Sequence, residues 1–255
     1  MCFDHDSRPP IAPIAGGALD GGLEPLTAAD GNRVLAFHAR PASPSGAGVV
    51  ILPDVRGLHP YYEELVLRVA EHGIEALAID LFGRTAATTD RGEDFEYTPH
   101  VAQTTWAGIS ADIAAGVSGI RAVDGVRSVF TLGFCMGGRM SFLAATLGLD
   151  LAGVIGFYGT LVGPWRNDAP APVDLTAAFE SPVLGLFGGA DQAITPDAIE
   201  AFDAGLTSAG IEHRVVTYPG APHSFFDRKA SEFADASAAA WGEALAFIEA
   251  HNPPT

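Results

Sequence analysis

Short apolar stretches alternate along the chain with longer segments of helical periodicity, and this pattern predicts strands that are connected by helices. The strands are expected at 32–39, 46–53, 75–79, 128–132, 153–157, 182–187 and 213–218, and the helices at 61–71, up to about 121, after 135, from 195 and at 230–250. The first strand alternates apolar and polar residues and is expected to be antiparallel. Because strand and helix then repeat, the expected fold class is a doubly wound, mostly parallel α/β sheet flanked by helices.

The length of the chain is compatible with one domain. Domains of the α/β class commonly reach 255 residues, and a hydrophobic content of 48% can fill a large core. A single domain is therefore expected over residues 1–255. Its N-terminal arm, residues 1–15, is rich in proline and charge and is interpreted as a strap over the surface. The connection at 81–99 has no clear period and is expected to wall a pocket.

The stretch from Val129 to Arg139 predicts a buried strand that delivers Cys135 to a turn into a helix. A nucleophile at such a corner has a strained backbone, and the strand and helix approach so closely that side chains two positions before and after it would collide. Gly133 and Gly137 occupy those two positions. The N-terminus of the following helix would favour the thiolate form of the cysteine. The pattern therefore predicts a nucleophile elbow that carries sulfur.

Two other interpretations fit parts of this stretch. A single buried cysteine is often an inert small hydrophobic residue, but such a residue gives no reason for glycines on both sides. The glycines could also form a phosphate-binding turn, yet no Lys-Ser or Lys-Thr pair follows them and the Gly-x-Gly-x-x-Gly spacing is missing. The nucleophile elbow is therefore the favoured interpretation.

An elbow nucleophile needs a carboxylate after a later strand and a histidine after the next one. Asp191 follows the apolar strand 182–187 and two glycines, and His223 follows the strand 213–218 and a Pro-Gly-Ala-Pro turn. Taken singly, the aspartate could be a turn residue and the histidine a surface one, since the chain has eight histidines. Because all three residues follow strands in the required order, the sequence predicts a catalytic triad of Cys135, His223 and Asp191.

Charge and composition restrict the partners. A net charge of −17 argues against nucleic acids and anionic membranes, both of which attract basic surfaces. No apolar run reaches the roughly 20 residues of a membrane span, and the N-terminus does not resemble a signal peptide, so a cytoplasmic monomer or small homo-oligomer is expected. The other cysteine, Cys2, is not expected to form a structural disulfide. Asp4-His5-Asp6 is interpreted as a solvated run, and no metal site is expected.

Further residues are expected around the triad. The Met136 N–H at the start of the helix and the Val55 N–H in the loop after 46–53 are predicted to form an oxyanion hole. Asp54 in the same loop could accept the thiol proton, or it could cap a turn or pair with an arginine. The candidates for binding a substrate carboxylate are Arg84, Arg228 and Arg56, and the alternative for each is an ordinary surface arginine.

Three motifs resemble those of the dienelactone hydrolase family: Gly133-Phe134-Cys135-Met136-Gly137-Gly138, Phe187-Gly188-Gly189-Ala190-Asp191 and Pro219-Gly220-Ala221-Pro222-His223-Ser224-Phe225. The resemblance covers about residues 47–250. It implies an α/β-hydrolase fold, no cofactor, and a Cys-His-Asp triad that opens an enol-lactone such as dienelactone to maleylacetate in chloroaromatic breakdown. It also implies that an acidic residue at the position of Asp54 takes the thiol proton once substrate is bound, and that Arg84 and Arg228 hold the substrate carboxylate.

The chain departs from the family's best-studied type near these residues. That type has glutamate where Asp54 stands and an aromatic residue where Arg56 stands, and its second arginine is one residue closer to the histidine. Three functions therefore stay open: a lactone hydrolase that forms an acyl-enzyme on Cys135, a broader carboxylesterase, and a non-enzymatic sensor of oxidants. The intact triad argues against the sensor. The two hydrolases differ in pocket shape and anion binding, which periodicity does not reveal.

Overall fold

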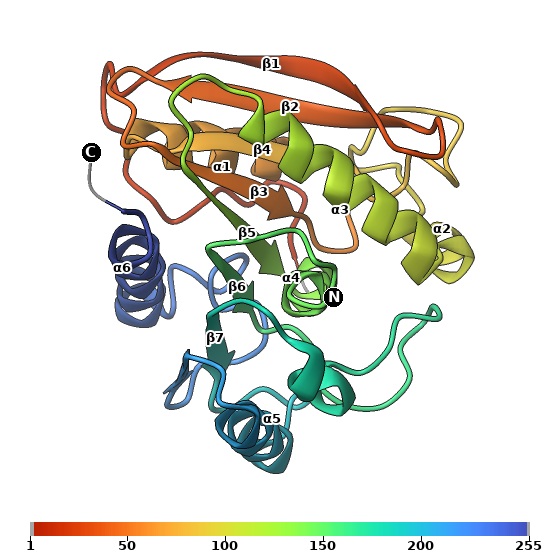
Figure 1. Ribbon diagram of the computed structural model, residues 1–255, viewed down its shortest axis with the longest axis vertical. Coiled ribbons are helices and arrows are strands. Elements are labelled where there is room, and N and C mark those ends of the chain that lie inside the picture. The colour runs from red at the N-terminus through yellow and green to blue at the C-terminus, as the bar shows by residue number, and fades with distance from the viewer. Residues whose placement is uncertain (1–2, 254–255) are drawn as a thin grey trace.

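Within residues 3–253, which the computed structural model describes, eight strands form one sheet in the order β1-β2-β4-β3-β5-β6-β7-β8 (Figure 1). The strands are β1 (Ala18–Thr27), β2 (Arg33–Pro41), β3 (Ala47–Leu52), β4 (Glu75–Ile79), β5 (Ser128–Phe134), β6 (Gly153–Phe157), β7 (Val183–Gly188) and β8 (His213–Tyr218). β2 runs antiparallel to β1 and β4, and all other neighbouring strands are parallel. The predicted doubly wound, mostly parallel sheet is confirmed.

Helices cover both faces of this sheet. They are α1 (Pro60–Glu71), α2 (Tyr97–Gln103), α3 (Trp106–Arg121), α4 (Met136–Ala144), α5 (Pro196–Ala209) and α6 (Ala234–Ala250), with a 3₁₀ helix η1 (Pro172–Ala178) before β7. On one face, Thr131 of β5 is hydrogen-bonded to Ser141 of α4, and α3 packs against Val50, the register partner of Thr131. On the opposite face, the ring of Phe130 lies 6.3 Å from that of Phe247 in α6. Figure 1 shows α3 in front of the sheet and α1 behind it.

Strand β1 is not predicted from the sequence. Its side chains are mostly exposed, so no apolar periodicity marks the segment, and Gly21, Gly22 and Pro25 are residue types that disfavour strands. The strand forms nevertheless because it pairs with β2 from Ala18 to Thr27. Tertiary pairing therefore outweighs the local preference at this edge of the sheet.

The described part of the N-terminal arm packs against the body of the protein. Phe3 is buried, and its ring centre lies 4.6 Å from the guanidinium carbon of Arg56. Cys2, for which no structural disulfide is expected, lies outside the described residues. Among residues 3–253, no helix is long and apolar enough to cross a membrane.

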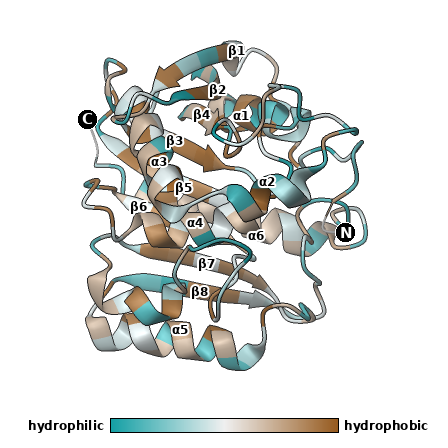
Figure 2. Cartoon of the chain, turned by 90° about the vertical axis from the view of Figure 1, so that its right-hand side faces the viewer, coloured by the Kyte–Doolittle hydropathy of each residue, from teal (hydrophilic) through white to brown (hydrophobic). Residues whose placement is uncertain are grey.

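The core lies along the central strands, and it determines where a site can form. Every residue of β3, β5, β6 and β7 is buried, and Figure 2 shows hydrophobic residues concentrated along these strands. Because these strands are parallel, their carboxyl ends meet at one edge of the sheet. In open α/β sheets, ligands bind outside this edge, where the connecting loops converge.

Candidate active site

Cys135 lies at the sharp turn between β5 and α4. Its backbone has a φ of 53° and a ψ of −109°, a conformation that non-glycine residues rarely adopt. A Cβ atom on Gly133 would lie 1.9 Å from the carbonyl oxygen of Gly137, and one on Gly137 would lie 1.9 Å from that of Leu52. Both glycines are therefore required by the close approach of the strand and the helix, as the sequence predicts for a nucleophile elbow.

The same close approach places the oxyanion candidates. Helix α4 begins at Met136, and the N–H groups of its first turn have no acceptor within the helix. Gly137 lets the end of β3 approach this turn, and the loop after β3 brings Val55 to the cavity that Cys135 also lines. This arrangement suits the predicted role of the Val55 and Met136 N–H groups at a developing oxyanion.

His223 and Asp191 come from the loops after β8 and β7. His223 Nδ1 lies 2.6 Å from Asp191 Oδ2, and Asp191 Oδ1 accepts backbone hydrogen bonds from Ala193 at 2.8 Å and Ile194 at 3.3 Å. Since a carboxylate only accepts, we assign the Nδ1 proton to the histidine, which leaves Nε2 as a proton acceptor. The two loops are also joined directly, because the Ala190 N–H donates to the carbonyl of Ala221 at 2.9 Å.

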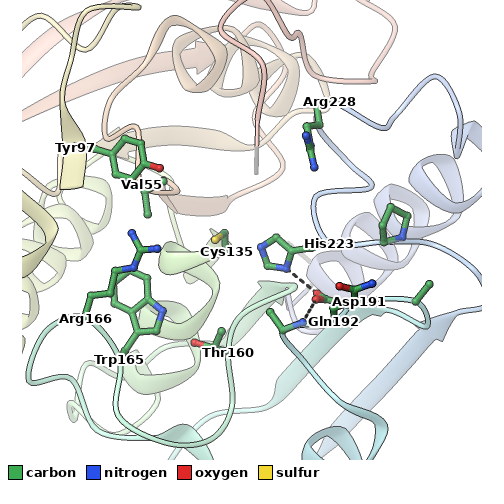
Figure 3. A pocket seen from close by; sticks show the side chains of 13 residues that line it. Val55, Tyr97, Cys135, Thr160, Trp165, Arg166, Asp191, Gln192, His223 and Arg228 are labelled. Carbon is green, nitrogen blue, oxygen red and sulfur yellow. Dashed lines mark hydrogen bonds and ion pairs between the residues drawn. The ribbon is translucent and has the colours of Figure 1, made fainter. Parts of the chain in front are cut away.

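Cys135, His223 and Asp191 line one cavity of about 450 Å³ at the predicted edge of the sheet (Figure 3). Figure 3 shows Cys135 and His223 next to each other, with Asp191 on the side of the histidine away from Cys135. Tyr97, from the connection 81–99, also lines the cavity, together with four residues that no sequence pattern marks: Thr160, Trp165, Arg166 and Gln192. The three residues predicted as a triad are therefore brought together by the fold.

Two arginines line this cavity in an otherwise acidic chain. Arg228, predicted as a carboxylate-binding residue, follows the histidine loop, and Arg166 lies in the connection after β6. Both residues are exposed, so their guanidinium groups remain accessible to a ligand. In Figure 3 they lie on opposite sides of Cys135, with Arg166 next to Trp165. Arg166 lies in an irregular segment, where no periodicity or motif could have identified it.

The structure does not bring Arg84 to this cavity, contrary to the expectation from sequence. Its guanidinium binds Asp112 in α3 at 2.8 Å and Asp30 in the β1–β2 turn at 2.6 Å. Instead, it borders a separate cavity of about 100 Å³. Both carboxylates raise the pKa of Arg84, Asp30 first. Within the connection 81–99, which was expected to wall the pocket, Tyr97 lines it. The location of Arg84 at a strand end did not reveal the direction of its side chain.

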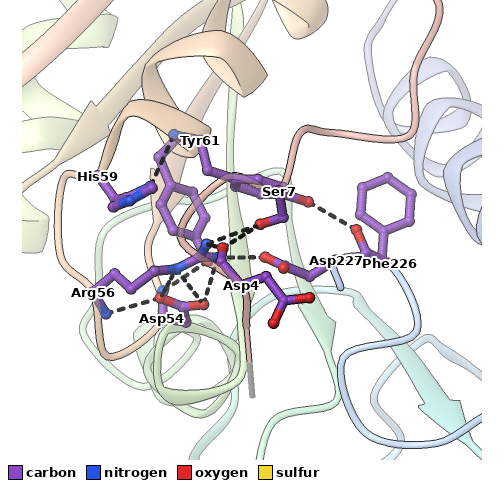
Figure 4. Close-up of polar contacts among 9 residues, drawn as sticks. Asp4, Ser7, Asp54, Arg56, His59, Tyr61, Phe226 and Asp227 are labelled. Atoms are coloured by element: carbon purple, nitrogen blue, oxygen red, sulfur yellow. Dashed lines mark hydrogen bonds and ion pairs between the residues drawn. The ribbon is translucent and has the colours of Figure 1, made fainter. Parts of the chain in front are cut away.

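Arg56 is also placed differently from the expectation, because it is buried and does not line the cavity. Figure 4 shows it among Asp54, Tyr61 and Asp227. Its guanidinium donates to Asp54 through Nε at 3.1 Å and Nη2 at 2.8 Å, and Nη2 also pairs with Asp227. Burial opposes the charge of Arg56, but the Asp54 carboxylate keeps its pKa above the ordinary value. The alternative in which Asp54 pairs with an arginine is thus the arrangement observed.

Asp227 carries the least satisfied carboxylate in this cluster. One of its oxygens, Oδ1, is buried and has no hydrogen-bond partner among the described residues. Burial raises the pKa of Asp227 to about 6, although the charge of Arg56 acts in the opposite direction. The aspartate lies next to Arg228 in the chain, and Asp54 lies next to Val55. The buried cluster therefore joins two loops that reach the cavity.

The protein has an α/β-hydrolase fold, and its cavity at the carboxyl edge of the sheet holds Cys135 on a strained turn. Residues 34–252 match the profile of the Dienelactone hydrolase family. A Salmonella typhimurium protein named "Putative carboxymethylenebutenolidase" is 30% identical over 226 residues, which cover 85% of this chain and 83% of that protein. A Methylorubrum extorquens protein of the same name is 31% identical over 221 residues, covering 84% and 75%.

Solved structures show the same relationship. The crystal structure of a protein titled "Putative Dienelactone Hydrolase", from Klebsiella pneumoniae, has a TM-score of 0.79 and 29% identity, covering 91% of this chain and 99% of that one. A dienelactone hydrolase-like promiscuous phosphotriesterase from metagenomic libraries has a TM-score of 0.73 at 22% identity over 91% and 99%, which shows the shared fold alone. The chain belongs to the dienelactone hydrolase family, and its class of activity is that of a hydrolase.

Proposed function

We propose that this protein hydrolyses an enol-lactone or a related carboxylic ester through Cys135 as the nucleophile, with His223 as the base and Asp191 as its orienting partner. The observation that carries this proposal is the 2.6 Å hydrogen bond between His223 and Asp191 in the cavity where Cys135 lies on a strained elbow. Membership of the chain in a hydrolase family also supports this proposal.

The reaction follows from these positions. His223 Nε2 takes the thiol proton, and the Sγ atom attacks the ester carbonyl carbon, while the N–H groups of Val55 and Met136 stabilise the oxyanion. The intermediate collapses when the C–O bond breaks, and His223 returns the proton to the leaving oxygen. A water molecule, deprotonated by the same histidine, then attacks the thioester. The C–S bond then breaks, the acid leaves, and His223 returns the proton to Sγ, which restores the Cys135 thiol.

The base in this proposal is His223 and not Asp54. Both oxygens of Asp54 accept hydrogen bonds from Arg56, and its side chain is 5% exposed. For Asp54 to take the thiol proton, it would first have to leave a buried partner, which is unfavourable because the buried arginine would lose one of its two carboxylates. The Asp54 of this chain therefore acts by holding Arg56 and the loop that carries Val55.

The substrate is proposed to carry a carboxylate close to the scissile bond. Two relatives carry the name "Putative carboxymethylenebutenolidase", which denotes action on a lactone with such a group. In this chain the groups available for it are Arg166 and Arg228, since both line the cavity while Arg84 and Arg56 bind aspartates elsewhere. Because Arg84 and Arg56 do not line the cavity, one alternative function is also supported, that of a carboxylesterase with broader specificity. A thiol that works in this way suits a reducing compartment, so a cytoplasmic location is proposed as well.

A paired substrate panel tests this function. Dienelactone and a neutral ester, p-nitrophenyl acetate, are compared for the native protein and for Cys135→Ala, Arg166→Gln and Arg228→Gln. We expect Cys135→Ala to abolish turnover of both. A hydrogen bond to a charged group contributes about 1.5–3 kcal/mol, so each arginine variant should lower kcat/KM for dienelactone by roughly 10- to 100-fold and leave the neutral ester largely unaffected. Equal kcat/KM values of native protein and arginine variants on dienelactone would favour the broader carboxylesterase.

A further inference from the structure

Arg139 is a fully buried arginine whose hydrogen-bond partners in the described chain are uncharged. It lies on α4, one helical turn after the proposed nucleophile, and is 0% exposed. Its Nη2 donates to the carbonyls of Gly163 at 2.9 Å and Ala169 at 3.0 Å, and its Nη1 to Thr160 Oγ1 at 3.3 Å. Burial lowers the pKa of Arg139 to about 10. Because a buried charge is costly unless it is well hydrogen-bonded, residues 160–169 are held in a loop around this guanidinium.

The loop is also attached to the segment between α2 and α3. Asp168 Oδ1 accepts a hydrogen bond from the Trp106 N–H at 2.5 Å, and Asn167 Nδ2 donates to Thr104 Oγ1 at 3.0 Å. Helix α2 carries Tyr97, which lines the cavity. The loop around Arg139 and helix α2 therefore form one connected wall, held from inside by the guanidinium and from outside by the start of α3.

This wall presents flat side chains to the cavity. Trp165 lies on the loop and Tyr97 on α2, and both line the cavity. Figure 3 shows them on the same side of Cys135, while His223 lies on the other side. The leaving oxygen of an ester must reach His223 to receive its proton, so the acyl group extends away from the histidine, toward the aromatic side chains. Aromatic rings favour offset or edge-to-face contacts with other planar groups.

We propose that Arg139 is a positioning residue, and that the wall it holds selects esters with a planar, aryl-like acyl group. The proposal rests on the proposed function, because it concerns the acyl side of the same cavity. Arg139 itself does not line the cavity and acts through Trp165, whose loop it fixes. Without the guanidinium, four oxygens of the loop would lose a donor, and the ring of Trp165 would no longer be held against the acyl group.

The test compares three p-nitrophenyl esters that share a leaving group: the acetate, the benzoate and the cyclohexanecarboxylate. The last two have acyl rings of the same size, of which only the benzoyl ring is planar. We expect the native protein to show at least a tenfold higher kcat/KM for the benzoate than for the cyclohexanecarboxylate. In Arg139→Met this preference should fall to less than threefold, mainly through a higher KM for the benzoate. The fold-loss in kcat/KM for the acetate should be at least ten times smaller than the fold-loss for the benzoate.

Two further variants keep the test decisive. Arg121→Met is the matched control, because Arg121 also donates to backbone carbonyls, those of Leu149 and Asp150, but is exposed and does not line the cavity; it should keep the native preference. Asp168→Ala releases the loop from α3 at an exposed position and should also reduce the preference for the benzoate. This variant tests the inference even when Arg139→Met does not fold.

Several results would overturn the inference. A native protein that hydrolyses both ring esters equally well would contradict the proposed selection of planar acyl groups. Equal losses on all three esters in a folded Arg139→Met variant, or an unchanged preference in both loop variants, would contradict the positioning role. In contrast, a native protein that hydrolyses none of the esters, or full activity in Cys135→Ala, would contradict the proposed function instead.

Discussion

Two buried arginines flank the proposed active site, and their surroundings differ. Arg56 lies between the carboxylates of Asp54 and Asp227, whereas Arg139 donates to carbonyl and hydroxyl oxygens. The pKa of Arg56 is raised by its carboxylate partners against burial, and that of Arg139 is lowered by burial to about 10. The same residue type therefore forms ion pairs that join loops on one side and shapes a single loop through neutral acceptors on the other.

The Arg56 side joins parts of the chain that are far apart in sequence. Arg56 Nη1 donates to Ser7 Oγ of the N-terminal arm at 3.2 Å, and the neighbouring Tyr61 hydroxyl donates to the carbonyl of Phe226 at 2.8 Å. The loops after β3 and β8 and the arm thus share one buried cluster. Because removing one member leaves buried charges without partners, this side should control stability, while the Arg139 side should control specificity.

The largest effect on stability is expected when Arg56 is replaced. Arg56→Met would leave the Asp54 and Asp227 carboxylates buried without their cation, and breaking such a pair costs about 3–5 kcal/mol of unfolding free energy. Urea denaturation would measure this loss. Arg8→Met is the control, because Arg8 forms an ion pair with Glu64 and its side chain is 80% exposed, and it should change stability by less than about 1 kcal/mol. Similar losses in both variants would show that the buried cluster is not special.

The next effect depends on pH and concerns Asp227. Burial raises the pKa of Asp227 to about 6 in the folded protein, from an ordinary value of 3.8 that applies to the unfolded chain. Between these pH values the folded state therefore binds a proton more tightly than the unfolded state. The stability contributed by this group is present below pH 4 and is lost as the pH rises through 6. Relative to the native protein, Asp227→Asn should therefore gain up to about 3 kcal/mol between pH 4 and pH 7, as converted from the shift.

Denaturation of both proteins at pH 4, 5.5 and 7 would measure this gain. His59 acts in the opposite direction, because burial first and Arg56 second lower its pKa to about 4, but it is present in both proteins and cancels in the difference. A difference between Asp227→Asn and the native protein that stays constant over this pH range would contradict the raised pKa of Asp227.

The smallest of these effects is expected for Arg84, which sharpens the comparison because its pairs are partly exposed. The Arg84 side chain is 25% exposed, and Asp112 keeps a hydrogen bond from Asn32 when the arginine is removed. Arg84→Met should lower the unfolding free energy by about 1–2 kcal/mol, in the range of ordinary point mutations. The ratio of kcat/KM for dienelactone to that for p-nitrophenyl acetate should stay native. A selective loss on dienelactone would restore Arg84 as a substrate-binding residue.

The contrast between these arginines also shows what the sequence could reveal. The placement of Cys135, Asp191 and His223 after strands is predictable from sequence, because buried strands have a clear apolar pattern and the glycines beside Cys135 have a steric cause. Arg84 also follows a strand, but its direction is set by Asp30, which lies in the turn of the unpredicted β1–β2 pair. Long-range partners of this kind leave no local pattern.

The wall of the cavity could not be predicted for a related reason. Trp165 and Arg166 lie in an irregular connection whose path depends on hydrogen bonds to Arg139 and to the start of α3. One signal in the sequence does bear on this wall: an arginine directly follows the two glycines, in a helix whose residues are otherwise apolar or small. A charged residue in such a position indicates a buried partner, although not which one.

The central claim is that Cys135 carries the acyl group during turnover. The most direct measurement is rapid acid quenching of the native protein with p-nitrophenyl benzoate, followed by mass spectrometry of its peptides. We expect a benzoyl adduct on the peptide that contains Cys135 in the native protein, and no adduct in Cys135→Ala. An adduct on another residue, or native turnover by Cys135→Ala, would contradict this claim.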